Sequence, residues 1–281
     1  GQFASINEAQ RNTLGDLIAR YMAEVTPTMK GAAEDKIRLK AIMRKPIAKW
    51  SMANLSAARI AGYRDERLKE VSSGTVIREL AYLSAIINHA RREWGINLPN
   101  PVQLVRKPQS PQARSRVLPD EEVAKLLQAL EPIGSRNPWT KPAVQLALAT
   151  AMRRGELLAL RWENVDLQNR TAFLSDTKNG ESRLVPLSTV AMQVLSDMPR
   201  HISGMVIPVK YFTLDAAFKR ARKRAGLDDV RFHDLRRTAI TRMAEKLPNV
   251  IELAAVSGHK SLMVLKRYYR PTAAELAQKL G

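Results

Sequence analysis

The sequence predicts a mainly α-helical protein with a small antiparallel β-hairpin or sheet. Apolar residues recur at helical spacing in most segments, one segment has the residues of a hairpin, and a proline-rich stretch separates two helical regions. The 281 residues, of which 45% are hydrophobic, suffice for a core in one large or two ordinary domains. We therefore expect an all-α domain over residues 1–107, a linker over 108–116 and a mixed, mostly helical domain over 117–281.

Four helices are predicted before the linker. Leu14, Leu17, Ile18 and Tyr21 recur at helical spacing, which predicts a helix over 13–25. Further helices are predicted over 33–43, 56–69 and 73–94, and no segment here has a strand pattern. Helices alone, in a region of this size, predict a small bundle.

Prolines punctuate the chain between Leu98 and Arg116, among Gln, Ser, Arg and Lys residues. Repeated prolines oppose helix formation and favour an extended chain, so this stretch is predicted to be an interdomain linker. A long ordered loop within one domain is the alternative. The linker is favoured because an apolar helical region lies on each side.

The region after the linker is predicted to be helical except for one hairpin. Pro119 and the three acidic residues that follow it are typical of a helix start. Thr171–Leu174 and Arg183–Leu187 are extended segments that flank Asn179-Gly180, a dipeptide typical of hairpin turns. Further helices are predicted over 138–151, 155–161, 188–198, 214–225, 233–246, 250–256, 261–269 and 273–280.

The charge balance indicates a polyanionic partner. The chain has 46 Lys and Arg against 27 Asp and Glu, a net charge of +19, and a pI of about 10.5. The regions before and after Ser110 are both basic, which favours a partner that touches both. Nucleic acid is the favoured partner, and anionic membranes, acidic proteins or a merely cationic surface are the alternatives.

Several classes of protein are excluded. The absence of cysteine excludes disulfide frameworks and thiolate metal sites. None of the four histidines pairs at metal-ligand spacing, and there is no P-loop, dinucleotide fingerprint or nucleophile elbow, so neither a metal nor a cofactor is expected. No apolar run is long enough to span a membrane, and the sequence GQFASINEAQ is unlike a signal peptide. We expect a cytoplasmic protein.

Three short segments combine residues that suit chemistry on an anion. In TAMRRGELL, Arg153 and Arg154 lie between two predicted helices, where a guanidinium faces either a ligand or solvent. In RFHDLRRT, His233 and Arg236 share one helical face and would suit two phosphate oxygens. A histidine that caps the helix start, with the arginine in solvent, is the alternative for this second segment.

The third segment joins Gly258-His259 to two tyrosines. Gly258 follows a predicted helix at a natural C-cap position, so His259 is expected on a turn between helices. Tyr268 and Tyr269 follow. A phenol is a nucleophile for covalent catalysis where cations stabilise the phenolate, although packing in a core is the commoner role of tyrosine.

In order, spacing and residue type, these segments resemble the tyrosine recombinase (phage-type integrase) family. The resemblance covers essentially the whole chain, with an all-α core-binding domain followed by an integrase-type catalytic domain. The residues that match the family's catalytic positions are Arg153, Lys178, His233, Arg236, His259 and Tyr268. Glu156 belongs to the first arginine box, and the resemblance implies that it orients the site.

The resemblance implies a reaction that needs neither a metal nor ATP. Tyr268 would attack the scissile phosphate to give a 3′-phosphotyrosine and a free 5′-hydroxyl. Arg153 and Arg236 would bind the non-bridging oxygens, the histidines would add hydrogen bonds, and Lys178 would protonate the leaving oxygen.

The implied partners are double-stranded DNA, held by the two domains as a clamp, and three further copies of the chain in a homotetramer. Accessory DNA-bending proteins, a nucleoid location in a bacterial cell, and recombination for a phage or mobile element are also implied. The helix over 273–280 is expected to dock either on a neighbouring protomer or on its own domain. A type IB-like topoisomerase and a non-catalytic DNA-binding regulator are the alternative functions.

The chain departs from the family pattern at a few positions. Ala151 stands where glycine is commoner, and we expect no effect on the chemistry. Tyr269 is a second phenol beside Tyr268, and Arg154 lies beside Arg153, so only the family pattern selects between these neighbours. Many members also carry an amino-terminal domain for arm-type DNA sites, which we do not expect in this chain.

Overall fold

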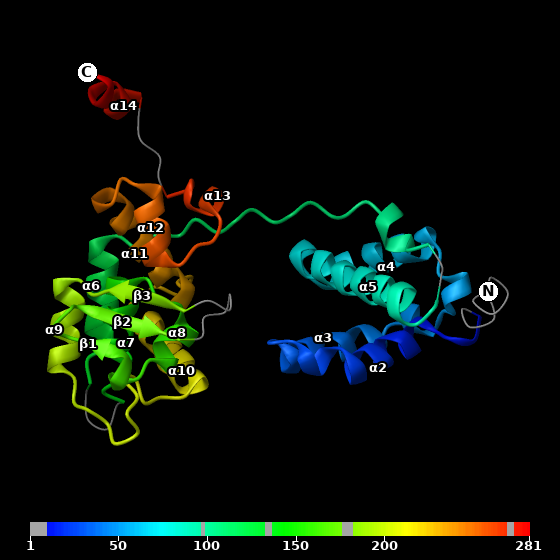
Figure 1. The fold of residues 1–281 in the computed structure, drawn as a ribbon, viewed down its shortest axis with the longest axis horizontal. Coiled ribbons are helices and arrows are strands. Elements are labelled where there is room, and N and C mark those ends of the chain that lie inside the picture. The colour runs from blue at the N-terminus through cyan, green and yellow to red at the C-terminus, as the bar shows by residue number, and fades with distance from the viewer. Residues whose placement is uncertain (1–9, 97–98, 133–136, 176–181, 269–272) are drawn as a thin grey trace. The chain divides into compact units, whose positions relative to one another are not determined.

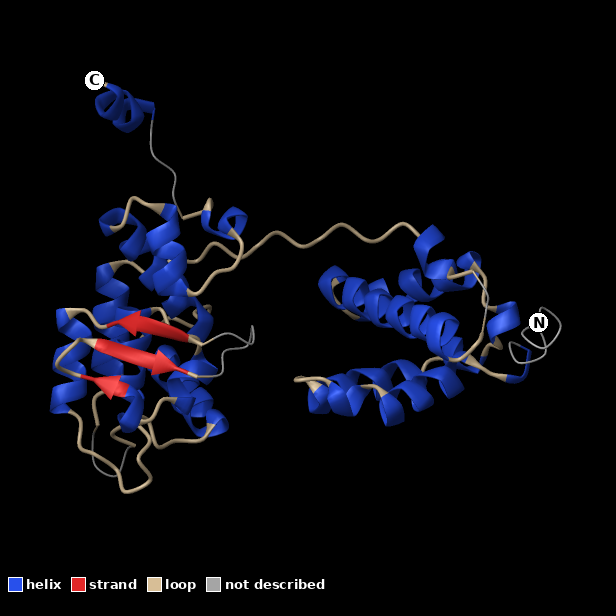
Figure 2. Cartoon of the chain, viewed as in Figure 1, coloured by secondary structure: helices blue, strands red, loops and turns tan. Residues whose placement is uncertain are grey.

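The computed structural model describes residues 10–96, 99–132, 137–175, 182–268 and 273–281, and it divides the chain into two compact units (Figure 1). The first unit is Gly1–Ala113 and the second is Arg114–Gly281. Both consist mainly of helices, and the one sheet of the described residues is a small antiparallel sheet in the second unit (Figure 2). The predicted fold class is therefore confirmed.

In its described residues, the first unit contains four long helices whose bounds match the predicted ones closely. They are α2 (Leu14–Glu24), α3 (Ala32–Met43), α4 (Ala57–Glu70) and α5 (Ser73–Glu93). Short 3-10 helices that the sequence pattern did not predict join or follow them, at Thr26–Thr28, Pro46–Lys49, Met52–Asn54 and Pro101–Leu104. Proline lies at the start of three of these, where its fixed φ suits a helical turn and its missing N–H is not needed.

Apolar helix faces form the core of the first unit. The buried side chains come from all four long helices, and include Leu17, Leu39, Ile60 and Leu83. The start of α2 is closed by Thr13, whose hydroxyl accepts a hydrogen bond from the Asp16 N–H at 3.1 Å while the Asp16 carboxylate accepts the Thr13 N–H at 2.9 Å. These local bonds explain why the first helix begins where its apolar pattern does.

A buried ionic network joins α4 to α5. Arg67 donates from Nε and Nη2 to the two carboxylate oxygens of Glu79, at 2.9 and 2.6 Å, and the Tyr63 hydroxyl donates to the same carboxylate at 2.7 Å. All three residues are less than a tenth exposed. Burial and the neighbouring Glu79 carboxylate raise the pKa of Tyr63, so its hydroxyl remains a donor.

The predicted linker has no regular structure after Leu104, and its last residues are bound to the second unit. Arg114 donates to the buried carboxylate of Asp234, at 2.9 Å from both Nε and Nη2. Arg116 donates to Glu122 at 2.6 Å and to Asp229 at 3.0 Å. The chain is therefore anchored at the point where the second unit begins.

Among the described residues, the second unit carries the sheet, nine α-helices and a 3-10 helix at Trp162–Asn164. The strands are β1 (Val165–Asp166), β2 (Thr171–Leu174) and β3 (Arg183–Pro186), in the order β1-β2-β3. The helices are α6 (Asp120–Ala129), α7 (Thr140–Thr150), α8 (Arg154–Ala159), α9 (Thr189–Asp197), α10 (Tyr211–Arg224), α11 (Phe232–Lys246), α12 (Val250–Ser257), α13 (Leu262–Leu265) and α14 (Ala273–Leu280).

The register of the sheet places one face on the core. Ala172 pairs with Val185 and both are buried, whereas the next pair, Phe173 and Leu184, is exposed. Helix α7 lies at the centre of the unit and contacts α6, α8, α9, α10 and α11. Every residue of α7 is buried or half-buried, as expected of a helix covered by neighbours on several sides.

Two features of the second unit differ from the predictions. The predicted helix over 261–269 is only α13, because the N–H groups of Val264 and Tyr268 bond three residues back and tighten the chain while Leu265 packs into a small core. Strand β1 was not predicted, since two residues carry too little pattern to be recognised. The hairpin strands and the other predicted helices are confirmed, with shifts of up to three residues at their ends.

In the described part of the chain, no helix combines the length and apolar character that crossing a membrane requires.

Replacing Glu79 should destabilise the first unit strongly. Glu79→Ala removes the buried carboxylate that pairs with Arg67, which then keeps only the exposed carboxylate of Glu70, and we expect a loss of about 3 kcal/mol in the free energy of unfolding. Hydrogen exchange of peptides from α4 and α5 measures this loss. Asp65→Asn, which removes an ion pair with a 58% exposed carboxylate, is the matched control and should change stability far less, because exposed ion pairs contribute little. Equal effects of the two variants would contradict the prediction.

Candidate active site

The first arginine box lies at a tight reversal between α7 and α8. Helix α7 ends at Ala151, which is fully buried and has a left-handed backbone with a φ of +52°. Arg153 then has an extended backbone and directly precedes α8. Because Ala151 turns the chain so sharply, its carbonyl faces away from α7 and accepts a hydrogen bond from Nη1 of Arg236.

Glu156 fixes Arg153 at the start of α8. One Glu156 oxygen accepts the Arg153 N–H at 2.8 Å and the other accepts Nη1 of Arg153 at 2.6 Å. Glu156 is 6% exposed. Burial by itself would raise the pKa of Glu156, but the hydrogen bonds from Arg153 and Arg183 outweigh it and hold the pKa below its usual value. An ionised Glu156 thus orients Arg153, as the resemblance implied.

Arg236 is buried in α11, so the alternative that placed it in solvent is wrong. It is 5% exposed. Its Nη2 donates to the Ser257 carbonyl at 2.6 Å, and its Nη1 donates to the Ala151 carbonyl. Burial and the charge of Arg153 lower the pKa of Arg236 to about 10, so it still carries its charge at neutral pH.

The end of α12 brings both arginine boxes together. Ser257 is the last residue of α12, and Gly258 follows it with a φ of +67°. The last carbonyls of a helix have no partner within it, and here Ser257 accepts Nη2 of Arg236 while Gly258 accepts Nη2 of Arg153 at 3.2 Å. The cations are well placed there, because the negative end of the helix dipole favours positive charge.

His259 is held as a neutral ring with a defined tautomer. The single hydroxyl proton of Ser257 is donated to the Leu253 carbonyl at 2.6 Å, so at 2.8 Å the His259 Nδ1–H must be the donor to the Ser257 oxygen. Partial burial and the charges of Arg236, Arg153 and Arg183 lower the pKa of His259 to about 4. At neutral pH its Nε2 therefore carries a lone pair that can accept a proton.

His233 and the two site arginines line one cavity of about 240 Å³. Met152, Tyr211 and Phe232 complete much of its wall. The His233 side chain remains exposed, but the surrounding protein displaces part of its water, and this effect and the charge of Arg236 lower its pKa. Arg154 also lines this cavity, which therefore presents three arginine side chains and an imidazole to a ligand that enters it.

Tyr268 lies beside His259, with 6.5 Å between the ring centroids. Its ring packs on the small core that contains Leu265, and Cζ of Arg237 lies 5.9 Å from the ring centroid. The structure thus places Tyr268 next to one of the predicted histidines. Lys178 and Tyr269 lie outside the described residues.

Neighbouring residues in the two arginine boxes have separate structural roles. Arg154 donates to Asp215 at 2.6 Å, and its Cζ lies 3.7 Å from the ring centroid of Tyr211. Asp234 accepts the Arg231 N–H at the start of α11 as well as the Arg114 guanidinium. Arg153 faces Gly258 while Arg154 is committed to Asp215, so the geometry separates two arginines that are adjacent in the sequence.

Arg183 is a site residue that the sequence analysis missed. Its guanidinium donates to both oxygens of Glu156, at 3.1 and 3.0 Å. A signal was present, since Arg183 shares the inward face of β3 with the buried Val185, a position where a charged side chain is unusual.

The charges of this region suit an anionic ligand. Arg153, Arg183 and Arg236 are opposed by the single carboxylate of Glu156 within this group. Two guanidinium groups can bind the oxygens of a phosphate with charge-assisted hydrogen bonds. Within the described ranges, no three His, Asp or Glu side chains are grouped so as to hold a metal ion.

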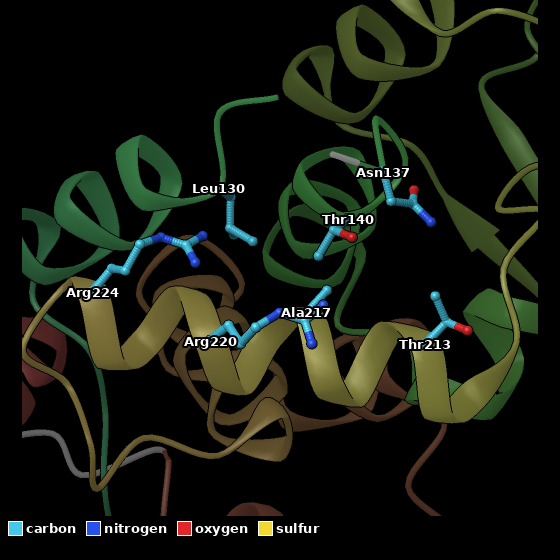
Figure 3. A pocket seen from close by; sticks show the side chains of 7 residues that line it. All are labelled: Leu130, Asn137, Thr140, Thr213, Ala217, Arg220 and Arg224. Carbon is cyan, nitrogen blue, oxygen red and sulfur yellow. The ribbon is translucent and has the colours of Figure 1, made fainter. Parts of the chain in front are cut away.

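A second cavity, of about 220 Å³, lies between α7 and α10 (Figure 3). Thr140, Arg220 and Arg224 are among its lining residues. It contains none of the residues predicted for the active site, so the cavity lined by Arg153, His233 and Arg236 remains the candidate site.

Comparisons with known proteins agree over nearly the whole chain. The Phage integrase family matches residues 116–275, and the family described as Phage integrase, N-terminal domain matches residues 10–108. A shufflon-specific DNA recombinase of Escherichia coli is 40% identical over 280 residues, which cover 96% of this chain and 72% of that protein.

Solved structures show a similar fold. A lambda integrase dimer bound to a COC′ core site is 24% identical, covers 90% of this chain and 97% of that one, and has a TM-score of 0.73. A lambda integrase tetramer bound to a Holliday junction is 24% identical, covers 92% of this chain and 80% of that one, and has a TM-score of 0.74.

Acidification should destabilise the protein through His259. Its pKa is about 4 in the folded chain against 6.5 for the free side chain, so between these values the unfolded chain binds a proton that the folded chain does not. The destabilisation is absent above 6.5 and grows as the pH falls toward 4. Thermal melting at about pH 7 and about pH 5 should show a smaller drop for His259→Gln than for the natural chain. An NMR titration midpoint of 6.5 for His259 would contradict the assignment.

Proposed function

The chain belongs to the phage integrase family, whose members are site-specific tyrosine recombinases, and we propose that Tyr268 is the nucleophile with which it cleaves and rejoins DNA. One observation carries the proposal. Arg153, His233 and Arg236 come from different segments of the chain and line one cavity, and Tyr268 lies beside His259, whose pKa is lowered by two of these cations.

Charge neutralisation is the first requirement of the reaction. A phosphodiester is an anion and repels an oxygen nucleophile, so the barrier falls only if fixed cations accept the charge that develops on the non-bridging oxygens. Arg153 and Arg236 serve this role in our proposal. Both are held by backbone carbonyls and need little reorganisation when the phosphate arrives. His233 would donate a further hydrogen bond.

His259 is the proposed proton acceptor. The Tyr268 hydroxyl loses its proton to Nε2 of His259, and the phenolate oxygen forms a bond to phosphorus. The bond from phosphorus to the 5′-oxygen breaks, which leaves a 3′-phosphotyrosine and a free 5′-hydroxyl. The reverse attack, by the 5′-hydroxyl of another strand, restores the phosphodiester and the tyrosine.

Lys178 is the proposed general acid. In the sequence it follows Leu174 of β2 and precedes Arg183 of β3, and its ammonium group would supply the proton that the leaving 5′-oxygen requires. Glu156 takes no part in proton transfer in this scheme, because its ionised carboxylate is fully occupied by Arg153 and Arg183.

The two units have different proposed roles on double-stranded DNA. Residues 1–107 form a helical DNA-binding domain of the core-binding type, residues 108–116 a linker and residues 117–281 the catalytic domain. Lambda integrase has been solved as a dimer bound to a core site and as a tetramer bound to a Holliday junction, and we propose that this chain also forms a homotetramer on DNA. Accessory DNA-bending proteins, and a location at the nucleoid in the bacterial cytoplasm, complete the proposal.

Tyr268→Phe should abolish the covalent protein–DNA adduct. The substitution removes only the oxygen that forms the bond to phosphorus, so DNA binding should be retained. Nicked suicide substrates that carry the target site would trap the adduct on a denaturing gel. Tyr269→Phe is the matched control and should form it. Adduct formation by Tyr268→Phe would overturn the assignment. Relaxation of supercoiled DNA without strand exchange would favour a type IB-like topoisomerase, and DNA binding without any adduct would favour a regulator.

Lys178→Ala should slow cleavage by about 10²–10⁴-fold, since the leaving oxygen then lacks its proton donor. A substrate with sulfur in place of the bridging 5′-oxygen should restore most of the rate, because a thiolate leaves without protonation. Single-turnover cleavage of the two substrates measures both effects. If the sulfur substrate is slowed as much as the natural one, Lys178 is not the general acid.

A further inference from the structure

We propose that Arg183 is a positioning residue of this active site, which holds Glu156 and the turn at Gly258 so that Arg153 and His259 face the scissile phosphate. The inference rests on the proposed function and assigns a role to a side chain outside the family-matched residues.

Arg183 completes the hydrogen-bonding of Glu156. Each Glu156 oxygen accepts one bond from Arg153 and one from Arg183, and the two bonds from Arg183 form a bidentate pair. The Arg183 side chain is 13% exposed and the Glu156 side chain 4% exposed. A carboxylate held from two sides cannot rotate, and so the direction of the Arg153 guanidinium is set by both arginines.

Arg183 also lies against the backbone of Gly258. A side-chain Cβ at position 258 would lie 2.7 Å from Cζ and 3.0 Å from Nε of Arg183, closer than real Cβ atoms approach such groups. Gly258 is therefore favoured by its φ of +67°, and a side chain at this position would also displace the Arg183 guanidinium. Since the Gly258 carbonyl accepts Nη2 of Arg153, Arg183 contacts both groups that orient Arg153.

Strand pairing fixes the backbone position of Arg183. It is the first residue of β3 and pairs with Leu174, the last residue of β2. Packing alone would favour an apolar side chain at this inward position, because the Nε of Arg183 is buried and makes no hydrogen bond. The arginine at this position is explained by its Nη1 and Nη2, which donate to Glu156.

The charge of Arg183 also reaches His259. After burial and the charges of Arg236 and Arg153, Arg183 is a further cause of the lowered pKa of His259. Loss of this charge should raise that pKa, whereas a purely structural role would leave it unchanged.

A pair of variants separates the two contributions of Arg183. Arg183→Lys keeps the charge but loses the bidentate contact with Glu156, and Arg183→Gln loses both. We expect either variant to slow adduct formation by about 10²-fold through misplaced Arg153, with the DNA dissociation constant changed by less than about twofold. The acid limb of the rate–pH profile should move to higher pH for Arg183→Gln only.

The matched control is Arg161→Gln, which removes a partly exposed arginine of the same unit that pairs with Glu163 at 2.9 Å. It should leave the rate of adduct formation and its pH profile unchanged.

Single-turnover adduct formation on nicked DNA, DNA binding and thermal melting are measured for all variants. The inference would be overturned if both variants formed the adduct as fast as the natural chain. It would also be overturned if the loss of rate only followed the loss of melting temperature and the pH profile of Arg183→Gln did not move. Failure of the natural chain itself to form an adduct would instead overturn the proposed function. If Arg183→Gln does not fold, Arg183→Lys alone still decides whether the rate falls without loss of binding.

Discussion

The candidate site in the second unit depends on the stabilisation of one buried cation, Arg236, that has no carboxylate partner among the described residues. Arg236 is 5% exposed and, among the described residues, forms no ion pair; two backbone carbonyls hold it instead, from Ala151 and Ser257. Burying an uncompensated charge costs several kcal/mol. Neutral dipoles reduce that cost without cancelling the charge, and the end of α12 adds the negative pole of a helix. The positive charge therefore remains available to a phosphate, which a salt bridge would have prevented.

Two left-handed residues create this arrangement. Ala151 ends α7 and Gly258 ends α12, and at both points the chain reverses so that carbonyls face inward toward the arginines. Glycine adopts this conformation freely, whereas alanine does so at a cost of about 1 kcal/mol. The buried Ala151 methyl group packs in the small core with Ala239 and Ile240, which offsets part of the strain. The Ala151 side chain thus lies in a core, whereas its carbonyl accepts Arg236 and belongs to the candidate site.

The two units use charge in opposite ways. In the first unit, Glu79 is surrounded by Arg67 and Tyr63, so that the buried charges are matched and the network joins two helices. In the second unit, one carboxylate, Glu156, serves two arginines and Arg236 has none. The first arrangement favours stability, and the second leaves a net positive charge in a confined space. Catalysis of phosphodiester transfer requires the second arrangement, because the transition state supplies the missing negative charge.

Much of the fold was readable from the sequence, because the face on which an apolar side chain lies depends only on local spacing. The helices and the hairpin strands were identified from such local patterns, whereas the candidate residues Arg153, Arg236 and His259 were selected by the resemblance to the family. The separate partners of Arg153 and Arg154, by contrast, are set by the tertiary structure, in which Arg154 donates to Asp215. The tautomer of His259 is likewise set by the bond from Ser257 to Leu253. The role proposed for Arg183 likewise follows from contacts with Glu156 and Gly258. Such contacts depend on how α8, α11, α12 and β3 pack together. The spacing of apolar residues within one segment does not specify which distant segment will pack against it.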